Sequence, residues 1–231
     1  RISRLATELE QVRKHRSVQR RGRRRNHWPL ASIVGYTNAG KSTLLNALTG
    51  AAVEAEDKLF ATLDPTTRKL TLETNQTVLL SDTVGFIRKL PHRLVEAFKA
   101  TLEEVAEADL LIHAVDVSHP QAEQQIEAVN DVLSEIGALE KPTLMVFNKI
   151  DRLETQDVLA QFVERFSPSV GVSAAKQLGF EPLKAHLSNS LRPIRSICRL
   201  QIPLDQSSVI ARLHEVGQVI ELRYEANHAI I

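Results

Sequence analysis

An eight-residue motif at residues 35–42 constrains the fold more than any other feature of this sequence. It fits the pattern G-x-x-x-x-G-K-S, follows a short apolar run at 31–34 and opens a helical pattern over 42–48. The glycines permit tight turns, so that successive backbone N–H groups face an anion, and the helix N-terminus adds partial positive charge. In this setting the motif predicts a phosphate-binding loop. The expected nucleotide contacts are Gly35, Tyr36, Thr37, Asn38, Ala39, Gly40, Lys41 and Ser42.

Within this loop, Lys41 is expected to reach the β- and γ-phosphates, and the Ser42 hydroxyl is expected to bind Mg²⁺.

A second motif, D-x-x-G at 82–85, follows the apolar run 77–80. Asp82 would contact the Mg²⁺ through a bound water, and the Gly85 N–H would sense the γ-phosphate. Alone this motif is weak, because ordinary turns share its composition. Its predicted nucleotide contacts are Asp82, Thr83, Val84 and Gly85.

A third motif, N-K-x-D at 148–151, predicts the base. It follows the apolar run 143–147. The Asp151 carboxylate can accept two N–H bonds from guanine, from N1 and the 2-amino group, whereas adenine would leave a buried carboxylate unpaired. Lys149 is expected to lie over the base, and Asn148 to tie this loop to the phosphate loop. With Asp82 forty residues after Ser42 (82 − 42 = 40), the set has the spacing of small G domains. The base-site residues are Asn148, Lys149, Ile150 and Asp151, together with Ser173, Ala174 and Ala175, whose backbone could donate to guanine O6.

Alternating strand and helix signals over residues 28–193 predict an α/β domain: a phosphate-loop three-layer sandwich with a mostly parallel sheet. The apolar runs lie at 33–34, 78–80, 110–112 and 144–147, and the helical patterns lie near 41–49, 92–107, 121–136, 155–165 and 181–190. Residues 194–231 predict a small α+β domain, with a strand near 197–203, a helix near 206–216 and a strand near 218–225.

Residues 1–27 predict a basic helical segment. Ile2, Leu5, Leu9 and Val12 form one apolar stripe, and Trp28-Pro29 indicates a boundary. The segment holds ten Lys/Arg against two Glu, hence +8, while the whole chain carries +1. A +8 segment on a −7 remainder suggests a phosphate-rich partner such as RNA. The alternative is a solvated linker.

Beyond these motifs, the chain resembles the HflX family of GTPases within the TRAFAC class. The stretches that carry the likeness are GYTNAGKST at 35–43, LFATLDPTTR at 59–68, DTVGFI at 82–87 and LPH at 90–92. The resemblance covers nearly all of the chain. It implies a GTPase that binds the ribosome at the large subunit, through rRNA, and in bacteria separates stalled subunits under stress. It also implies a further N-terminal domain, of which residues 1–27 would be the trailing end.

The resemblance also selects one switch residue. The residues themselves offer three threonines, Thr62, Thr66 and Thr67, in the loop before the second strand, and Mg²⁺ chemistry does not choose between them. The family pattern points to Thr62. The metal ligands implied are then Ser42, Thr62 and Asp82, and the adjoining nucleotide contacts are Phe60, Ala61, Thr62, Leu63 and Asp64.

Hydrolysis raises a separate question, because Phe86 stands just after D-x-x-G, where many small GTPases carry a glutamine that orients water. Slow intrinsic turnover is expected. Related GTPases with Asn at position 38 use it to hold K⁺ against the phosphates; the alternative is that Asn38 only supports the loop through local hydrogen bonds. The candidate catalytic residues are Lys41, Thr62, Gly85 and Asn38.

The remaining features narrow the class of protein. No apolar run reaches the length of a membrane span, and the single Cys198 fits a reducing compartment, so a cytoplasmic protein is expected. A monomer is expected as well. His113, inside an apolar run, is expected to be a core histidine, and Glu103, Glu104 and Glu107 are expected on a solvated helix face. The leading function is a slow, Mg²⁺-dependent GTPase on the ribosome. The alternative is a regulatory GTP/GDP switch that recruits a protein partner.

Overall fold

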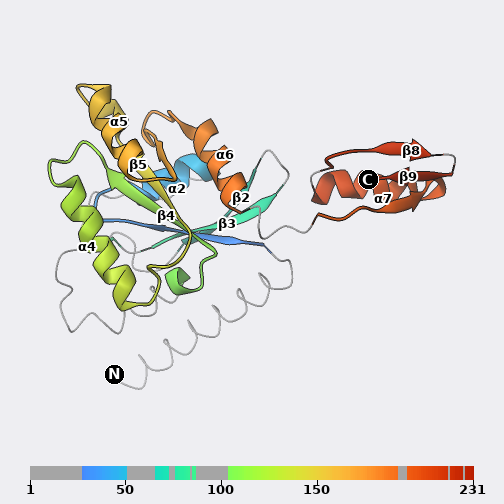
Figure 1. Ribbon diagram of the computed structural model, residues 1–231, viewed down its shortest axis with the longest axis horizontal. Helices are drawn as coiled ribbons and strands as arrows, with labels where there is room; N and C mark the ends of the chain where they lie inside the picture. Colours follow the sequence, from blue (N-terminus) through green and yellow to red (C-terminus); the bar gives the residue numbers. More distant parts are fainter. Residues whose placement is uncertain are drawn as a thin grey trace, which may run out of the picture.

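The computed structural model of the 231-residue chain describes residues 28–50, 66–72, 76–83, 85–86, 104–191, 197–217, 219–225 and 227–231. The predictions for residues 1–27, for residues 60–64 and for Val84 lie outside these described residues. Within them the strands form two sheets, one of six strands and one of three (Figure 1).

The larger sheet is mostly parallel and has the order β2-β3-β1-β4-β5-β6. Of its described strands, β2 alone runs antiparallel to its neighbour, β3. Every residue of β1 and β4 is buried, which is why both strands are mostly apolar; the exceptions are Ser32, His113 and Asp116. The predicted α/β class is confirmed. The strands are β1 (Leu30–Val34), β2 (Thr66–Thr71), β3 (Thr77–Asp82), β4 (Leu110–Asp116), β5 (Thr143–Asn148) and β6 (Ser169–Gly171).

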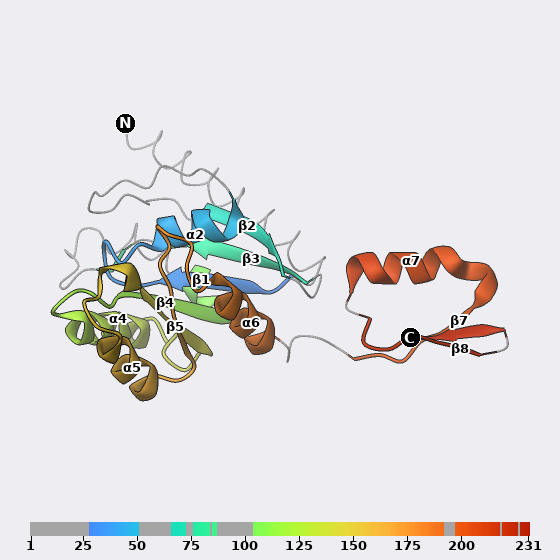
Figure 2. The same cartoon turned by 90° about the horizontal axis from the view of Figure 1, so that it is seen from above.

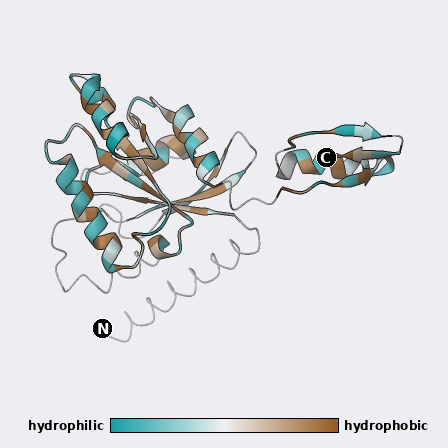
Figure 3. Cartoon of the chain, in the orientation of Figure 1, coloured by the Kyte–Doolittle hydropathy of each residue, from teal (hydrophilic) through white to brown (hydrophobic). Residues whose placement is uncertain are grey.

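Helices cover both faces of this sheet. On one face, α2 (Lys41–Thr49) and α6 (Phe180–Ser190) pack on alternate strand residues such as Ile112 and Val146. On the other, α4 (Ala122–Glu135) packs on Leu111, and α5 (Gln156–Arg165) packs near Phe147. Successive strand residues point to opposite faces of the sheet, so a strand contributes side chains to the apolar core on each face. Hydrophobic residues accordingly gather on the central strands, and hydrophilic ones on the outer faces of the helices (Figure 3).

The smaller sheet is antiparallel, with the order β7-β9-β8. The helix α7 lies along one face of it (Figure 2), and its Ile210 packs with Ile202 and Ala229 in a small core. The prediction of a strand, a helix and a strand is correct in type, but the structure adds the last strand, β9. The elements are β7 (Gln201–Pro203), η4 (Leu204–Gln206), α7 (Ser207–Val216), β8 (Arg223–Glu225) and β9 (His228–Ile230).

Two sequence predictions need correction. Thr66 and Thr67, expected in the loop before the second strand, instead form the first residues of β2 and pair with Asp82 and Ser81. Glu104, expected on a solvated helix face, is half-buried and accepts a hydrogen bond from the buried Ser81 hydroxyl at 3.4 Å. Among the described helices, none is long and apolar enough to cross a membrane.

Candidate functional site

Five parallel strands end at the same edge of the larger sheet, and the predicted motifs follow four of them. The loop 35–42 follows β1, the motif that begins with Asp82 starts at the last residue of β3, residues 148–151 begin at the last residue of β5, and residues 173–175 come after β6. Ligands of open α/β sheets bind at the carboxyl ends of the strands. The topology therefore brings motifs that are far apart in the sequence to one place.

Lys41 begins α2 and is almost completely buried, with 7% of its surface exposed. Its ammonium donates a hydrogen bond of 2.9 Å to the carbonyl of Tyr36, in its own loop. Burial lowers the pKa of Lys41 to about 8, because desolvation disfavours the charged form, and the nearby Asp82 carboxylate opposes the shift. A cation held in a desolvated cradle of backbone N–H groups is suited to bind phosphate.

Ser42 and Asp82 lie against each other at the start of α2 and the end of β3. The Ser42 hydroxyl donates to Asp82 Oδ2 at 2.5 Å, across forty residues of sequence. Asp82 is 2% exposed. A hydroxyl and a carboxylate are hard oxygen ligands, which Mg²⁺ prefers beside nucleotide phosphates. The pair therefore fits the metal site expected from the sequence.

The residues after Asp82 are attached to the phosphate loop. The Thr37 N–H donates to the carbonyl of Phe86 at 2.9 Å, and the Phe86 N–H donates to the carbonyl of Gly35 at 3.1 Å. A methyl group at Gly85 would lie 2.7 Å from Thr37 Cγ2 and 3.1 Å from Lys41 Nζ, so only glycine fits. Thr83 is buried and donates its hydroxyl to the carbonyl of Ile33 at 2.6 Å, which makes it a structural contact.

Phe86 is completely buried, and its ring belongs to the apolar cluster that includes Val34, Leu111 and Val129. The side chain therefore points into the core beneath the phosphate loop. Its backbone, rather than its side chain, contributes to the site. This burial is the structural reason why position 86 carries a hydrophobic residue here.

Asn148 joins three motifs. Its Nδ2 donates to the carbonyl of Ala39 in the phosphate loop at 2.9 Å, which is the tie expected from the sequence. Its Oδ1 accepts from the N–H of Ala174 at 3.0 Å. Gly40, at φ +90°, passes so close that a methyl group there would meet Asn148 Nδ2 at 2.3 Å. The phosphate loop and the two base-site loops are thus positioned by one buried amide.

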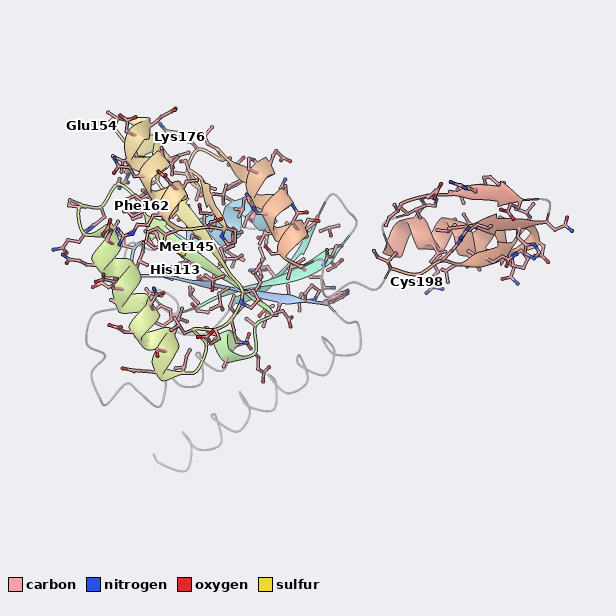
Figure 4. The ribbon with its side chains drawn as sticks, viewed as in Figure 1. His113, Met145, Glu154, Phe162, Lys176 and Cys198 are labelled. Carbon is pink, nitrogen blue, oxygen red and sulfur yellow. The ribbon has the colours of Figure 1, made fainter. Side chains whose placement is uncertain are left out.

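Asp151 lies beside the loop after β6. The Ser173 hydroxyl donates to its carboxylate and lowers the pKa of Asp151 more than burial raises it. The exposed Lys176 ammonium, labelled in Figure 4, lies 3.9 Å from Asp151 Oδ2. Ser173, expected to contribute through its backbone, therefore also orients the carboxylate that would select guanine. Of the other predicted base-site residues, Ala175 is exposed. Ile150 donates its N–H to the carbonyl of Val172 at 3.2 Å, which joins the loop after β5 to the segment after β6.

The sequence predicts Asn38 in the phosphate loop as a candidate ligand of K⁺. Asn38 is exposed and has φ +63°, a left-handed conformation that asparagine tolerates. Among the described residues, no hydrogen bond involves its side-chain amide.

His113 is 1% exposed and pairs with Met145 across β4 and β5 (Figure 4), so it is a core histidine as expected. Burial, followed by the charge of Lys41, lowers the pKa of His113 to about 4.

Sequence reasoning missed Asp116, the last residue of β4. Its carboxylate is paired with Lys149 at 2.7 Å, within the site. A signal was present, because Asp116 closes an apolar run just as Asp82 does. An acidic residue at the carboxyl end of a parallel strand is a candidate for the ligand edge even without a motif.

Comparisons with known proteins show what this chain is similar to. Residues 31–149 match the protein family described as 50S ribosome-binding GTPase. The GTPase HflX of Caldanaerobacter subterraneus subsp. tengcongensis is 48% identical over 221 residues, which cover 96% of this chain and 50% of that protein. The GTPase HflX of Escherichia coli is 44% identical over 222 residues, covering 96% and 52% respectively. The chain thus spans about half the length of the curated relatives it matches.

Solved structures show the same architecture. A GTP-binding protein from the archaeon Sulfolobus solfataricus, in complex with GDP, matches with a TM-score of 0.60 and 28% identity, covering 84% of this chain and 62% of that one. A single-site variant of Era from Aquifex aeolicus, bound to GDP.AlF4-, matches with a TM-score of 0.58 and 24% identity, covering 70% and 56%. The second likeness shows the fold alone.

Proposed function

Because this chain belongs to the family of 50S ribosome-binding GTPases and is similar to HflX proteins over nearly its whole length, we propose that it binds GTP with Mg²⁺ and hydrolyses it to GDP. The observation that carries the proposal is the double hydrogen bond of Asn148 to Ala39 and Ala174. This contact assembles a phosphate loop, an aspartate that matches guanine and a backbone donor at one edge of the sheet.

Different residues are proposed to bind the phosphates and the Mg²⁺. Lys41 supplies positive charge at the β- and γ-phosphates, and the backbone of residues 35–42 encloses them. Ser42 and Asp82 would hold Mg²⁺, which when bound neutralises charge that develops on the phosphate oxygens. The Gly85 N–H would sense the γ-phosphate. Thr62 is proposed as the third metal ligand, and residues 60–64 as further nucleotide contacts, although they lie outside the described residues.

Selection of guanine tests this function most directly. Asp151, oriented by Ser173, pairs with N1 and the 2-amino group of guanine. Competition binding should therefore give GTP at least about 100-fold tighter binding than ATP. Asp151→Asn should shift the preference toward xanthine nucleotides, because the amide donates to the extra carbonyl of xanthine. Equal affinity for ATP and GTP would refute the proposal, and an unchanged preference in Asp151→Asn would refute this base contact.

We also propose that the chain belongs to a protein that acts on the large ribosomal subunit. The support is the description of the matching family and the likeness to HflX proteins. The test is co-sedimentation of the chain with purified large subunits in the presence of a non-hydrolysable GTP analogue and of GDP. More protein in the pellet with the analogue than with GDP is expected. The alternative of a switch that recruits a protein partner would be favoured if a protein of the relatives' full length that contains this chain were equally absent from both pellets.

A potassium ion at Asn38 is the last part of the proposal. The Asn38 side chain is exposed in the phosphate loop, and its amide oxygen can serve as a ligand for an alkali cation. Such an ion, when bound, would offset negative charge in the transition state as an arginine finger does. Turnover should be faster in KCl than in NaCl, and Asn38→Ala should remove the difference. Equal rates in the two salts would return Asn38 to a purely structural role.

A further inference from the structure

Both the backbone and the ammonium group of Lys149 are fixed by the structure. Its backbone has φ +65°, a left-handed conformation that is unfavourable for lysine. Its ammonium donates to the carbonyl of Asn38 at 2.8 Å and forms an ion pair of 2.7 Å with Asp116 Oδ2. Since the sheet order is β1-β4-β5, the side chain starts after β5, crosses the end of β4 and reaches the loop after β1. It therefore spans three strand ends.

Asp116 is itself fixed in place. It closes β4, pairs with Asn148 across the sheet, and its side chain is 12% exposed. While Oδ2 faces Lys149, Oδ1 accepts hydrogen bonds from the Ser118 N–H at 3.1 Å and the Ser118 hydroxyl at 2.6 Å. The carboxylate cannot rotate without breaking three contacts. A carboxylate fixed in this way determines where the lysine lies.

We propose that Asp116, held by Ser118, is a positioning residue of the guanine site, which keeps Lys149 across the phosphate loop before the nucleotide arrives. The inference rests on the proposed function, in which the aliphatic stem of Lys149 packs on the base. It adds a residue outside all of the nucleotide motifs, and it assigns to Asp116 an effect on affinity without any contact to the ligand.

The expected size of the effect follows from populations. A long lysine side chain without a fixed partner samples many rotamers, and binding must then select the competent one. If loss of the carboxylate leaves Lys149 in place for about a tenth of the time, the apparent Kd rises about tenfold. The increase should lie mainly in a slower apparent association, because only the fraction of the free protein that already has Lys149 in place can bind.

The experiment is a double-mutant cycle on the 231-residue chain, with a fluorescent GDP analogue as the probe. Asp116→Asn should raise the Kd about tenfold in the wild-type background. In a Lys149→Met background, which keeps the stem and removes the ammonium, the same change should alter the Kd by less than about twofold. A role in fold stability alone would raise the Kd by the same factor in both backgrounds, and that result would overturn the proposal.

Two further variants make the test sharper. Asp109→Asn is the matched control, because Asp109 precedes the same strand at its opposite end, where it accepts a hydrogen bond of 2.8 Å from the Leu30 N–H. It should leave GDP affinity unchanged. Ser118→Ala keeps the ion pair and should raise the Kd about threefold, which tests the proposal if Asp116→Asn does not fold. An unchanged Kd in Ser118→Ala would count against it.

The two proposals fail in different ways. If the wild-type chain showed no preference for GDP over ADP, the proposed function would be wrong, and the positioning role with it. If wild type bound GDP selectively and Asp116→Asn bound it equally well, the positioning role alone would be wrong.

Discussion

Lys41 combines a buried ammonium with a task that requires its charge. Its pKa is lowered to about 8 by burial, whereas bound phosphates would raise it again. Above pH 8 the Lys41 ammonium of the free protein loses a proton, and the protein must take up a proton again when it binds the nucleotide. We therefore predict that the Kd for GDP is constant from about pH 6.5 to 7.5 and rises by up to about tenfold per pH unit above pH 8. Titration calorimetry in two buffers of different ionisation enthalpy would measure the proton uptake.

The stability of the nucleotide-free chain should change in the opposite sense. The unfolded chain binds more protons than the folded one between pH 8 and the ordinary lysine value of 10.5, so the free energy of unfolding should rise with pH there. Lys41→Met is the control, since it lacks the titrating group and should abolish both dependences. A flat Kd in the wild-type chain up to about pH 9 would contradict the burial argument.

Phe86 leads to a prediction about rate. Its ring is buried in the core and no side chain at this position can orient the attacking water, so we expect the isolated chain to turn over less than about once per minute. Phe86→Gln should not accelerate the reaction. It should instead lower the free energy of unfolding by about 3 kcal/mol, because an amide would replace a packed ring. Single-turnover hydrolysis and denaturant unfolding measure the two effects, and a faster Phe86→Gln variant would disprove this account.

At the scale of elements, the site depends on how closely two loops approach. Gly85 is the point of contact between the segment after β3 and the phosphate loop, where a methyl group would meet Thr37 Cα at 3.0 Å and Thr37 Cγ2 at 2.7 Å. Gly85→Ala should force the loops apart. We predict that affinity for a GTP analogue falls by about tenfold or more, while GDP affinity changes much less, because the Gly85 N–H is assigned to the γ-phosphate.

The control for Gly85→Ala is Gly217→Ala, at the end of α7. A methyl group there has Leu213 O at 3.5 Å as its nearest neighbour, an ordinary contact, and φ is −141°. This variant should bind both nucleotides as the wild type does. If Gly85→Ala weakened GDP and the GTP analogue equally, Gly85 would be a packing residue of the loop and the γ-phosphate assignment would be wrong.

Elements with a strong local pattern could be predicted from the sequence, and those without it could not. The strands β4 and β5 are mostly apolar, so both strands, and the motif after β5, could be located before the structure. Strand β9 has three residues, which is too few for any periodicity, and it is fixed only by pairing with β7 and β8. Thr66 and Thr67 belong to no apolar run; pairing with β3 places them in a strand.

The same distinction applies to the candidate site. Motif residues such as Ser42 and Asp82 could be predicted because the phosphate chemistry demands their types at a known spacing. The contacts of Asp116 with Lys149 and of Ser173 with Asp151 depend on which strand ends lie side by side. Sheet order is a property of the three-dimensional fold, and single-sequence patterns do not contain it.

At the scale of the whole molecule, our proposal divides the chain into three parts and assigns an activity to two of them. Residues 28–193 carry the nucleotide site, residues 194–231 include the small sheet, and residues 1–27 carry a charge of +8 from ten Lys/Arg and two Glu. The basic part lies outside the described residues, so its role rests on charge alone. Every residue assigned to the nucleotide site lies at or after Gly35. The two activities, nucleotide binding and RNA binding, should therefore be separable by mutation.

This separation leads to a prediction for the arginines at 20, 21, 23, 24 and 25. If they face rRNA, each neutralised phosphate releases counterions, and affinity for the large subunit should fall steeply with salt. Changing all five to Gln should weaken subunit binding and lower the slope of log K against log salt by about one for each phosphate that is no longer neutralised. Nucleotide affinity should not change. Co-sedimentation at several KCl concentrations measures the affinity for the large subunit and its salt slope, with GDP binding as the internal control. An unchanged affinity and slope would mean that the basic run is a solvated linker whose charges do not touch RNA.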